Sequence, residues 1–222
     1  MAWGTAPPRP RPRASGPDNA ASGVVILTGV TTPLAASNPR PTVPAAYSLG
    51  MEKMSIRPVR TTDVQGIKAL VAPLVQENIL ITKDTVTYYE NIQEFVVAQD
   101  ESGDLVGCGA LHVMWEDLAE VRTLATSAKA RGRGVGRRML EVLIQRAEGL
   151  GVSRVFCLTF EVEFFSAHGF EVMENQESID PDVFAELLRS HDEGVAEFLD
   201  LARVKPNTLG NTRMIRQLHV AG

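Results

Sequence analysis

The sequence predicts a single α/β domain, in which helices flank a mixed central sheet and a disordered tail precedes the domain. Three observations support this prediction. Residues 1–54 differ in composition from the rest of the chain, strand-like segments dominate residues 94–126, and a helix followed by a strand occupies residues 134–160. Strands followed by a strand-helix-strand unit are typical of a mixed sheet with helices packed on it. We therefore expect a tail over residues 1–54 and a domain over residues 55–222.

The tail is rich in proline, arginine and alanine and has almost no acidic residues. Such a segment cannot bury enough apolar surface to offset its conformational entropy, so we expect it to be disordered. Its apolar patch is short for the core of a secretion signal, and its basic region is long and rich in proline. An alternative is that translation begins at Met51 or Met54, downstream of the tail.

The composition excludes several classes of protein. Hydrophobic residues make up 44% and charged residues 22% of the 222 residues, and the net charge is −5, which argues against a dedicated nucleic-acid-binding protein. Cys108 and Cys157 lie in apolar runs without metal-ligand spacing, so we expect buried thiols and no metal site. No apolar run reaches the roughly 18 residues of a membrane helix, and we expect a cytoplasmic protein without a membrane partner. The sequence leaves open whether the chain forms a homo-oligomer.

The period of the apolar residues gives the individual elements. Alternation or a continuous apolar run indicates a strand, and apolar residues three and four apart indicate a helix. Asp180 before Pro181 predicts one helix start, and Gly151 predicts one helix stop. The expected strands are 55–60, 94–99, 105–115, 117–126, 152–160, 170–173, 196–204 and 212–218, and the expected helices are 64–74, 83–91, 134–149, 162–168 and 181–190.

A basic, glycine-rich loop over residues 127–138 opens directly into the helix expected at 134–149. Glycines let the backbone approach a ligand, and the N–H groups of the first helical turn favour an anion. Arg131 and Arg133 would add charge-assisted hydrogen bonds, so a pyrophosphate suits this loop. The alternative is a tight connection without a ligand. The loop lacks the Gly-Lys-Ser/Thr sequence of a phosphate-binding P-loop and the spacing of a dinucleotide-binding motif.

Two motifs resemble the GNAT superfamily of N-acetyltransferases. Arg131-x-x-Gly134-x-Gly136 is similar to the acetyl-CoA loop of that superfamily, and residues 164–170 resemble its short helix ending in Gly-Phe. The resemblance implies a GNAT-like fold with acetyl-CoA as cosubstrate. It also implies that these residues contact acetyl-CoA: Leu124, Ala125, Arg131, Gly132, Arg133, Gly134, Val135, Gly136 and Arg137.

Five segments resemble, more narrowly, the acetyltransferase domain of N-acetylglutamate synthase in its short, stand-alone type. They are residues 73–81, 107–112, 120–125, 154–159 and 210–213. This family opens arginine biosynthesis by transferring an acetyl group to the α-amino group of L-glutamate, so L-glutamate is the expected small-molecule partner. Longer members carry an amino-acid-kinase-like domain that senses arginine. A chain of 222 residues has no room for that domain, which leaves arginine feedback open.

The resemblance assigns two catalytic residues. Glu120 matches the family's catalytic glutamate, and a carboxylate near the thioester can take the proton of the attacking amine. Thr159 matches a position that bears a hydroxyl group and is a candidate to protonate the leaving thiolate. The superfamily often uses a tyrosine for that step, but Phe165 stands there, so the amine's own proton is an alternative source. A backbone N–H near Leu124 would stabilise the oxyanion.

An acceptor with two carboxylates requires cationic or N–H-rich groups around it. Lys83 matches a substrate-contacting position that is often arginine in the family. Arg122 lies two residues after Glu120, hence on the same face of the strand, where it needs an anion. Further acceptor residues are expected from the C-terminal segment, namely Lys205, Asn211 and Arg213.

Two other functions remain open from the sequence alone. The same chemistry could act on a different amine, such as a peptide N-terminus or a polyamine. A cationic acceptor would then require acidic residues where Lys83 and Arg122 stand. Alternatively, a non-catalytic acyl-CoA sensor would keep the loop but would not need Glu120.

Overall fold

One sheet organises the part of the chain that the structure describes. The computed structural model describes residues 54–174, 179–201, 204 and 210–219, so the expected tail lies outside the described residues apart from residue 54. The sheet has the order β1-β2-β3-β4-β5-β7-β6. Its strands are β1 Ser55–Pro58, β2 Phe95–Gln99, β3 Leu105–Trp115, β4 Leu118–Thr126, β5 Arg154–Thr159, β6 Glu171–Val172 and β7 Thr212–Gln217.

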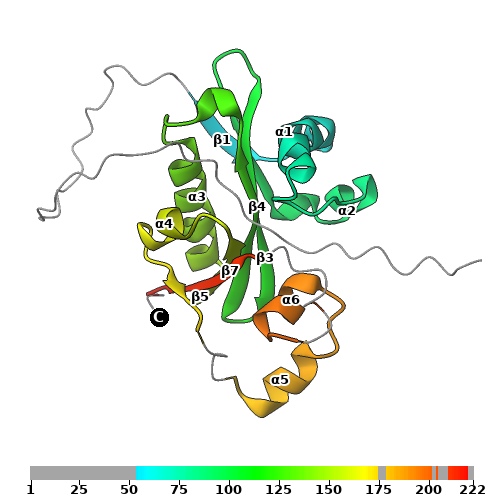
Figure 1. Ribbon diagram of the computed structural model, residues 1–222, viewed down its shortest axis with the longest axis vertical. Helices are drawn as coiled ribbons and strands as arrows, with labels where there is room; N and C mark the ends of the chain where they lie inside the picture. The colour runs from blue at the N-terminus through cyan, green and yellow to red at the C-terminus, as the bar shows by residue number, and fades with distance from the viewer. Residues whose placement is uncertain (1–53, 175–178, 202–203, 205–209, 220–222) are drawn as a thin grey trace, which may run out of the picture.

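Helices cover both faces of this sheet (Figure 1). The α-helices are α1 Val64–Gln76, α2 Thr85–Glu90, α3 Val135–Gly149, α4 Val162–Ser166, α5 Pro181–Leu187 and α6 Glu193–Phe198. The 3-10 turns are η1 Thr61–Asp63, η2 Ile92–Glu94 and η3 Ala128–Ala130. Among the described residues, no helix has the length and apolarity needed to span a membrane.

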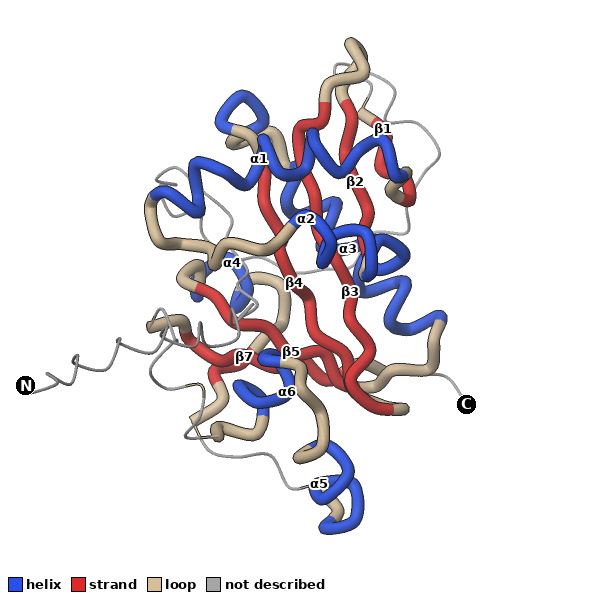
Figure 2. The backbone as a smooth tube through the Cα atoms, turned by 90° about the vertical axis from the view of Figure 1, so that its right-hand side faces the viewer, coloured by secondary structure: helices blue, strands red, loops and turns tan. Residues whose placement is uncertain are grey.

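The strand residues alternate between the two faces, as the pleat requires. In β4, Ala119 and Val121 point into the core under α3 and α4, whereas Leu118 points into the core under α5 and α6. Phe95 and Val97 of β2 pack under α1 and α2. In Figure 2, α1 and α2 lie over one end of the sheet, and α5 and α6 lie toward the other end. The face that carries Glu120 is therefore covered by two separate helix pairs.

The sheet opens at its centre, between β4 and β5. These strands are parallel and pair only from Leu118 with Arg154 to Glu120 with Phe156. Beyond Glu120, β4 remains paired with β3, while β5 pairs with β7. The strands therefore part directly after Glu120, and β4 continues to Thr126, from which the loop leads into α3.

The expected strand over residues 196–204 is wrong, because the segment begins with α6. The side chain of Asp192 accepts a hydrogen bond from the Val195 N–H and caps this helix. All residues from Gly194 to Phe198 are buried, Glu197 included, so the helix has no exposed polar face to distinguish it from a buried strand. The other predicted helices and strands are present with ends shifted by a few residues, and Asp180 caps α5 as expected.

Candidate active site

The centre of the site is a β-bulge in β4. The pairing of β3 with β4 shifts between Cys108 and Ala110, which leaves an extra residue on β4. Thr123 lies at this bulge with φ of 51° and is buried. A β-branched residue in the left-handed region is strained, and bulges are frequent beside active sites because they redirect the backbone. The bulge follows Glu120 and Arg122 and lies just before Leu124.

Glu120 is fully buried on the face of the sheet covered by α6. One carboxylate oxygen, Oε2, accepts a hydrogen bond of 2.7 Å from Nε of Arg122. The other oxygen, Oε1, has no hydrogen-bond partner within the described residues. Burial raises the pKa of Glu120, with a smaller contribution from the negative charge of Asp192, and Arg122 opposes the increase. A carboxylate with a raised pKa and an unpaired oxygen is suited to accept a proton.

Arg122 links two carboxylates. Its Nη2 donates a hydrogen bond of 2.5 Å to Oδ1 of Asp192 in addition to the bond from Nε to Glu120. Burial alone would lower the pKa of Arg122, but the two carboxylates more than compensate and raise it. The sequence predicted that Arg122 needs an anion, and Glu120 and Asp192 supply two.

Helix α6 is in close contact with this ion pair. A Cβ atom placed on Gly194 would lie 2.0 Å from Oε2 of Glu120 and 2.8 Å from Nη2 of Arg122. Only glycine allows the backbone of α6 to approach so closely. The first turn of α6 therefore closes one side of the Glu120 carboxylate.

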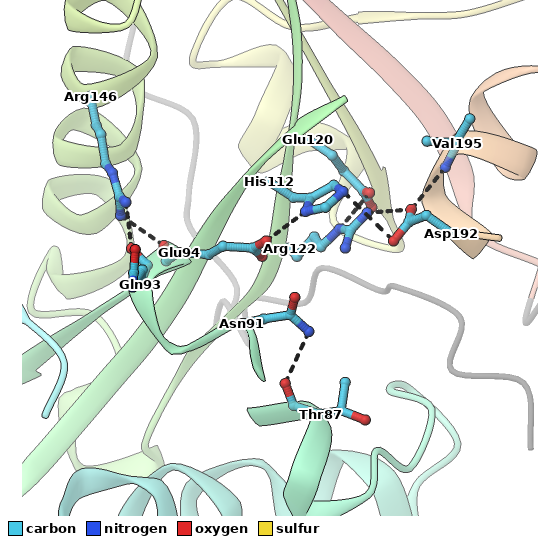
Figure 3. Close-up of polar contacts among 10 residues, drawn as sticks. All are labelled: Thr87, Asn91, Gln93, Glu94, His112, Glu120, Arg122, Arg146, Asp192 and Val195. Carbon is cyan, nitrogen blue, oxygen red and sulfur yellow. Dashed lines mark hydrogen bonds and ion pairs between the residues drawn. The ribbon is translucent and has the colours of Figure 1, made fainter. Parts of the chain in front are cut away.

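A chain of polar contacts extends from Asp192 to the opposite side of the site, as Figure 3 shows. Nε2 of His112 lies 3.7 Å from Oδ2 of Asp192, and Nδ1 lies 2.6 Å from Oε1 of Glu94. Glu94 ends η2, so His112 connects the α2–β2 side of the site with α6. The sequence alone predicted no function for His112, Glu94 or Asp192.

Lys83 lies on the loop between α1 and α2, and lines a small pocket together with Arg122, Asn91 and Glu94. Lys83 is half-buried, and its pKa is lowered first by burial and then by the positive charge of Arg122. It also lines an open cavity of about 230 Å³ between α1 and α2. The fold thus brings together the two predicted acceptor cations, Lys83 and Arg122, although 39 positions separate them in the sequence.

The predicted anion-binding loop precedes α3. Gly132 and Gly134 have φ of 75° and 73°, and nothing lies within 4 Å of a Cβ built on either. Gly134 is the N-cap of α3 and offers no side chain to the first helical N–H groups, which have no acceptor within the helix. Arg131, Arg133 and Arg137 are exposed around it. An open glycine loop, uncapped N–H groups and three arginines suit a pyrophosphate.

The position of α3 depends on a second pair of glycines. A Cβ on Gly107 would lie 2.6 Å from Sδ of Met139, and one on Gly109 would lie 3.1 Å from Leu143. These glycines let α3 pack closely on β3. The side chains of Leu124, Ala125 and Val135 are buried in the core, so any contact that they make with a cofactor has to involve the backbone.

The remaining predicted residues lie around β5 and β7. Thr159 is fully buried, and its Oγ1 accepts a hydrogen bond of 2.8 Å from the Glu161 N–H. It follows Cys157 on the face that α3 and α4 cover, opposite to Glu120. Arg213 lies 3.7 Å from Oδ1 of Asp200 and donates to the Glu197 carbonyl.

Two more acceptor predictions concern the segment before β7. Oδ1 of Asn211 is buried without a partner among the described residues. Lys205 lies outside the described residues. No group of acidic, histidine and cysteine side chains in the described ranges is suited to hold a metal ion.

Comparisons with known proteins identify the family. The model of the acetyltransferase (GNAT) family matches residues 73–170. An amino-acid acetyltransferase of Mycobacterium tuberculosis is 51% identical over 162 residues, which make up 72% of this chain and 92% of that protein. Another, from Neisseria meningitidis serogroup A, is 35% identical over 126 residues, which make up 56% of this chain but only 29% of that protein.

Solved structures agree with this result. A Mycobacterium tuberculosis protein in complex with CoA and NLQ is 50% identical with a TM-score of 0.69, and the match covers 74% of this chain and 99% of that one. N-acetylglutamate synthase from Neisseria gonorrhoeae, complexed with coenzyme A and N-acetyl-glutamate, is 27% identical with a TM-score of 0.61. That match covers 77% of this chain and 36% of the other. The chain therefore belongs to the GNAT acetyltransferase family and, within it, to the amino-acid acetyltransferases.

Proposed function

We propose that this enzyme transfers the acetyl group of acetyl-CoA to the α-amino group of L-glutamate, the reaction of N-acetylglutamate synthase that begins arginine biosynthesis. The observation that carries the proposal is Glu120, a buried carboxylate with one unpaired oxygen at the point where β4 and β5 part. The related Neisseria gonorrhoeae enzyme binds coenzyme A and N-acetyl-glutamate, and this supports the same pair of substrates here.

Acetyl-CoA would be held at the start of α3. Its pyrophosphate suits the loop from Arg131 to Arg137, where arginines and helical N–H groups converge. Its pantetheine arm would follow the opening between β4 and β5, with the thioester beside the bulge at Thr123. The backbone N–H of Leu124 is then the candidate to stabilise the oxyanion, since the bulge redirects the strand at this residue.

The reaction would proceed by direct transfer. The acceptor arrives as an ammonium ion and must lose a proton before its nitrogen attacks the thioester carbonyl. Glu120 takes that proton, directly or through a water molecule, on the oxygen that has no partner among the described residues. The tetrahedral intermediate collapses, the C–S bond breaks, and the CoA thiolate is protonated by Thr159 or by the proton that the amine has lost. The role of Thr159 remains a prediction, because its hydroxyl oxygen already accepts a hydrogen bond from the Glu161 N–H and its side chain lies on the face of the sheet opposite to Glu120.

The acceptor carboxylates would be bound on the side of α1 and α2. Nε and Nη2 of Arg122 are already paired with Glu120 and Asp192, so Lys83 is the stronger candidate for a direct ion pair with the substrate. An anion beside Lys83 would compensate the positive charge of Arg122. Arg213 and Asn211 are the candidates from β7 and the residue before it.

An acceptor screen tests this proposal. Purified enzyme, acetyl-CoA and one amine are mixed, and release of the CoA thiol is followed for L-glutamate, L-glutamine, a neutral peptide and a polyamine. The proposal predicts the highest kcat/KM with L-glutamate and N-acetylglutamate as the product. Release of the CoA thiol with another amine, but not with L-glutamate, would refute L-glutamate as the acceptor. CoA binding without turnover of any amine would support a sensor instead of an enzyme.

A further inference from the structure

Asp192 is the residue of α6 that reaches the catalytic ion pair. Its Oδ1 accepts hydrogen bonds from Arg122 Nη2 and from the Val195 N–H, at 2.5 and 3.0 Å. Its own N–H donates to Oγ of Ser190, at 3.1 Å. Asp192 is therefore held from several directions, and the close contact of Gly194 with Glu120 fixes α6 at the same place.

The arrangement divides one guanidinium between two carboxylates. Arg122 donates from Nε to Glu120 and from Nη2 to Asp192, and the arginine is almost completely buried. A guanidinium that served Glu120 alone would stabilise the ionised carboxylate strongly and make it a poor base. A second carboxylate on the same arginine reduces that stabilisation.

We propose that Asp192 is a positioning residue for the catalytic base, because by sharing Arg122 with Glu120 it keeps that carboxylate basic enough to take the proton of the acceptor amine. This inference rests on the proposed role of Glu120. It assigns Asp192 a function beyond capping α6. It also explains why the first turn of α6 approaches the sheet so closely that only glycine is accommodated at residue 194.

The electrostatic surroundings of Glu120 and Asp192 are consistent with this role. Although burial opposes the change, the Arg122 charge lowers the pKa of Asp192, so Asp192 is the carboxylate that stays ionised. The same aspartate contributes to the raised pKa of Glu120. Among the described residues, His112 from β3, Lys83 from the α1–α2 loop and Cys157 from β5 also interact electrostatically with this pair, and Glu94 from η2 contacts the other side of His112.

A purely structural reading would make Asp192 the N-cap of α6 and nothing more. Asp180 provides the matched control for that reading. It caps α5 by accepting the N–H groups of Asp182 and Val183, and it is exposed. Asparagine is about as good an N-cap as aspartate, so Asp192→Asn and Asp180→Asn both retain the cap and remove one negative charge.

The experiment compares kcat/KM for the acceptor as a function of pH in the wild-type enzyme, Asp192→Asn and Asp180→Asn, with thermal unfolding as a second readout. For Asp192→Asn, we expect the acid limb of the profile to move to lower pH by roughly half to one unit, because Glu120 becomes the only carboxylate on Arg122. The plateau should fall severalfold, since a weaker base transfers protons less well. Asp180→Asn should leave the profile unchanged.

An acid limb of Asp192→Asn that stays in place, or moves to higher pH, would overturn the proposal. If Asp192→Asn does not fold, Asp192→Ser retains a capping oxygen and must show the same shift. Glu120→Gln separates this inference from the proposed function. If Glu120→Gln is inactive and the Asp192 limb does not move, only the role of Asp192 fails, whereas an active Glu120→Gln enzyme refutes the base itself.

Discussion

Replacing Gly194 by alanine places a methyl group against the catalytic carboxylate. The new Cβ would lie 2.0 Å from Oε2 of Glu120 and 2.9 Å from its Cδ. Ordinary contact begins near 3.4 Å, so α6 or the Glu120 side chain has to move by about 1.4 Å. Movement of either group lengthens the bonds that Arg122 makes to Glu120 or Asp192.

Two effects on stability oppose each other in this variant. Alanine is favoured over glycine in a helix by about 1 kcal/mol, but overpacking a well-filled site costs typically about 1–3 kcal/mol. We expect the cost to exceed the gain here, because both groups that the methyl meets belong to a buried ion pair. The free energy of unfolding should therefore decrease by roughly 1–2 kcal/mol, or several degrees in Tm.

Gly149 is the matched control. It lies in the last turn of α3, and nothing is within 4 Å of a Cβ built on it. Gly149→Ala should therefore raise stability by up to about 1 kcal/mol and leave kcat unchanged. Urea unfolding and steady-state kinetics measure both quantities. If Gly194→Ala is as stable and as active as the wild-type enzyme, α6 does not contact Glu120 as described.

Three further predictions follow from the cofactor loop, the acceptor pocket and the core. Arg131→Ala should raise KM for acetyl-CoA roughly 10-fold or more through the loss of a charged hydrogen bond, measured by steady-state kinetics, whereas Arg189→Ala, at an exposed position just after α5, should not. Burial lowers the pKa of Lys83, so this side chain should lose its charge, and KM for L-glutamate should begin to rise with increasing pH, below the usual lysine range. A KM that does not depend on pH in Lys83→Met would confirm that Lys83 causes this rise. Burial raises the pKa of Cys108 to about 12 and also raises the pKa of Cys157 well above its usual value. Neither thiol should therefore react with a thiol reagent in the native enzyme, and rapid labelling would contradict their burial.

The sequence predicted the elements whose pattern is local. The continuous apolar run of β5 and the amphipathic face of α3 both indicated the correct element. The glycine-rich loop indicated an anion site for the same reason, because the residue types that create it are adjacent. Glu120 required the family resemblance, since an isolated glutamate on a strand has no distinctive pattern.

Long-range contacts were not predictable in this way. Asp192 lies 70 positions from Arg122, and no motif connects the two. The sequence predicted a strand over residues 196–204, because a short helix that is buried on all sides lacks an amphipathic face. Asp192 as an N-cap and Gly194 two residues later were the available signals for a helix whose first turn packs closely against another group. The strain at Thr123 could not be predicted either, because threonine normally favours extended backbone.

The most direct test of the proposed mechanism is the turnover of Glu120→Gln with L-glutamate and acetyl-CoA, measured together with its affinity for CoA. Glutamine retains the size of the side chain and can still bind Arg122, but it cannot accept the proton of the amine. We predict that kcat falls by roughly 10²–10⁴-fold while the Kd for CoA changes little, since the cofactor loop lies outside the ion pair. An unchanged kcat would contradict the role of Glu120 as the general base.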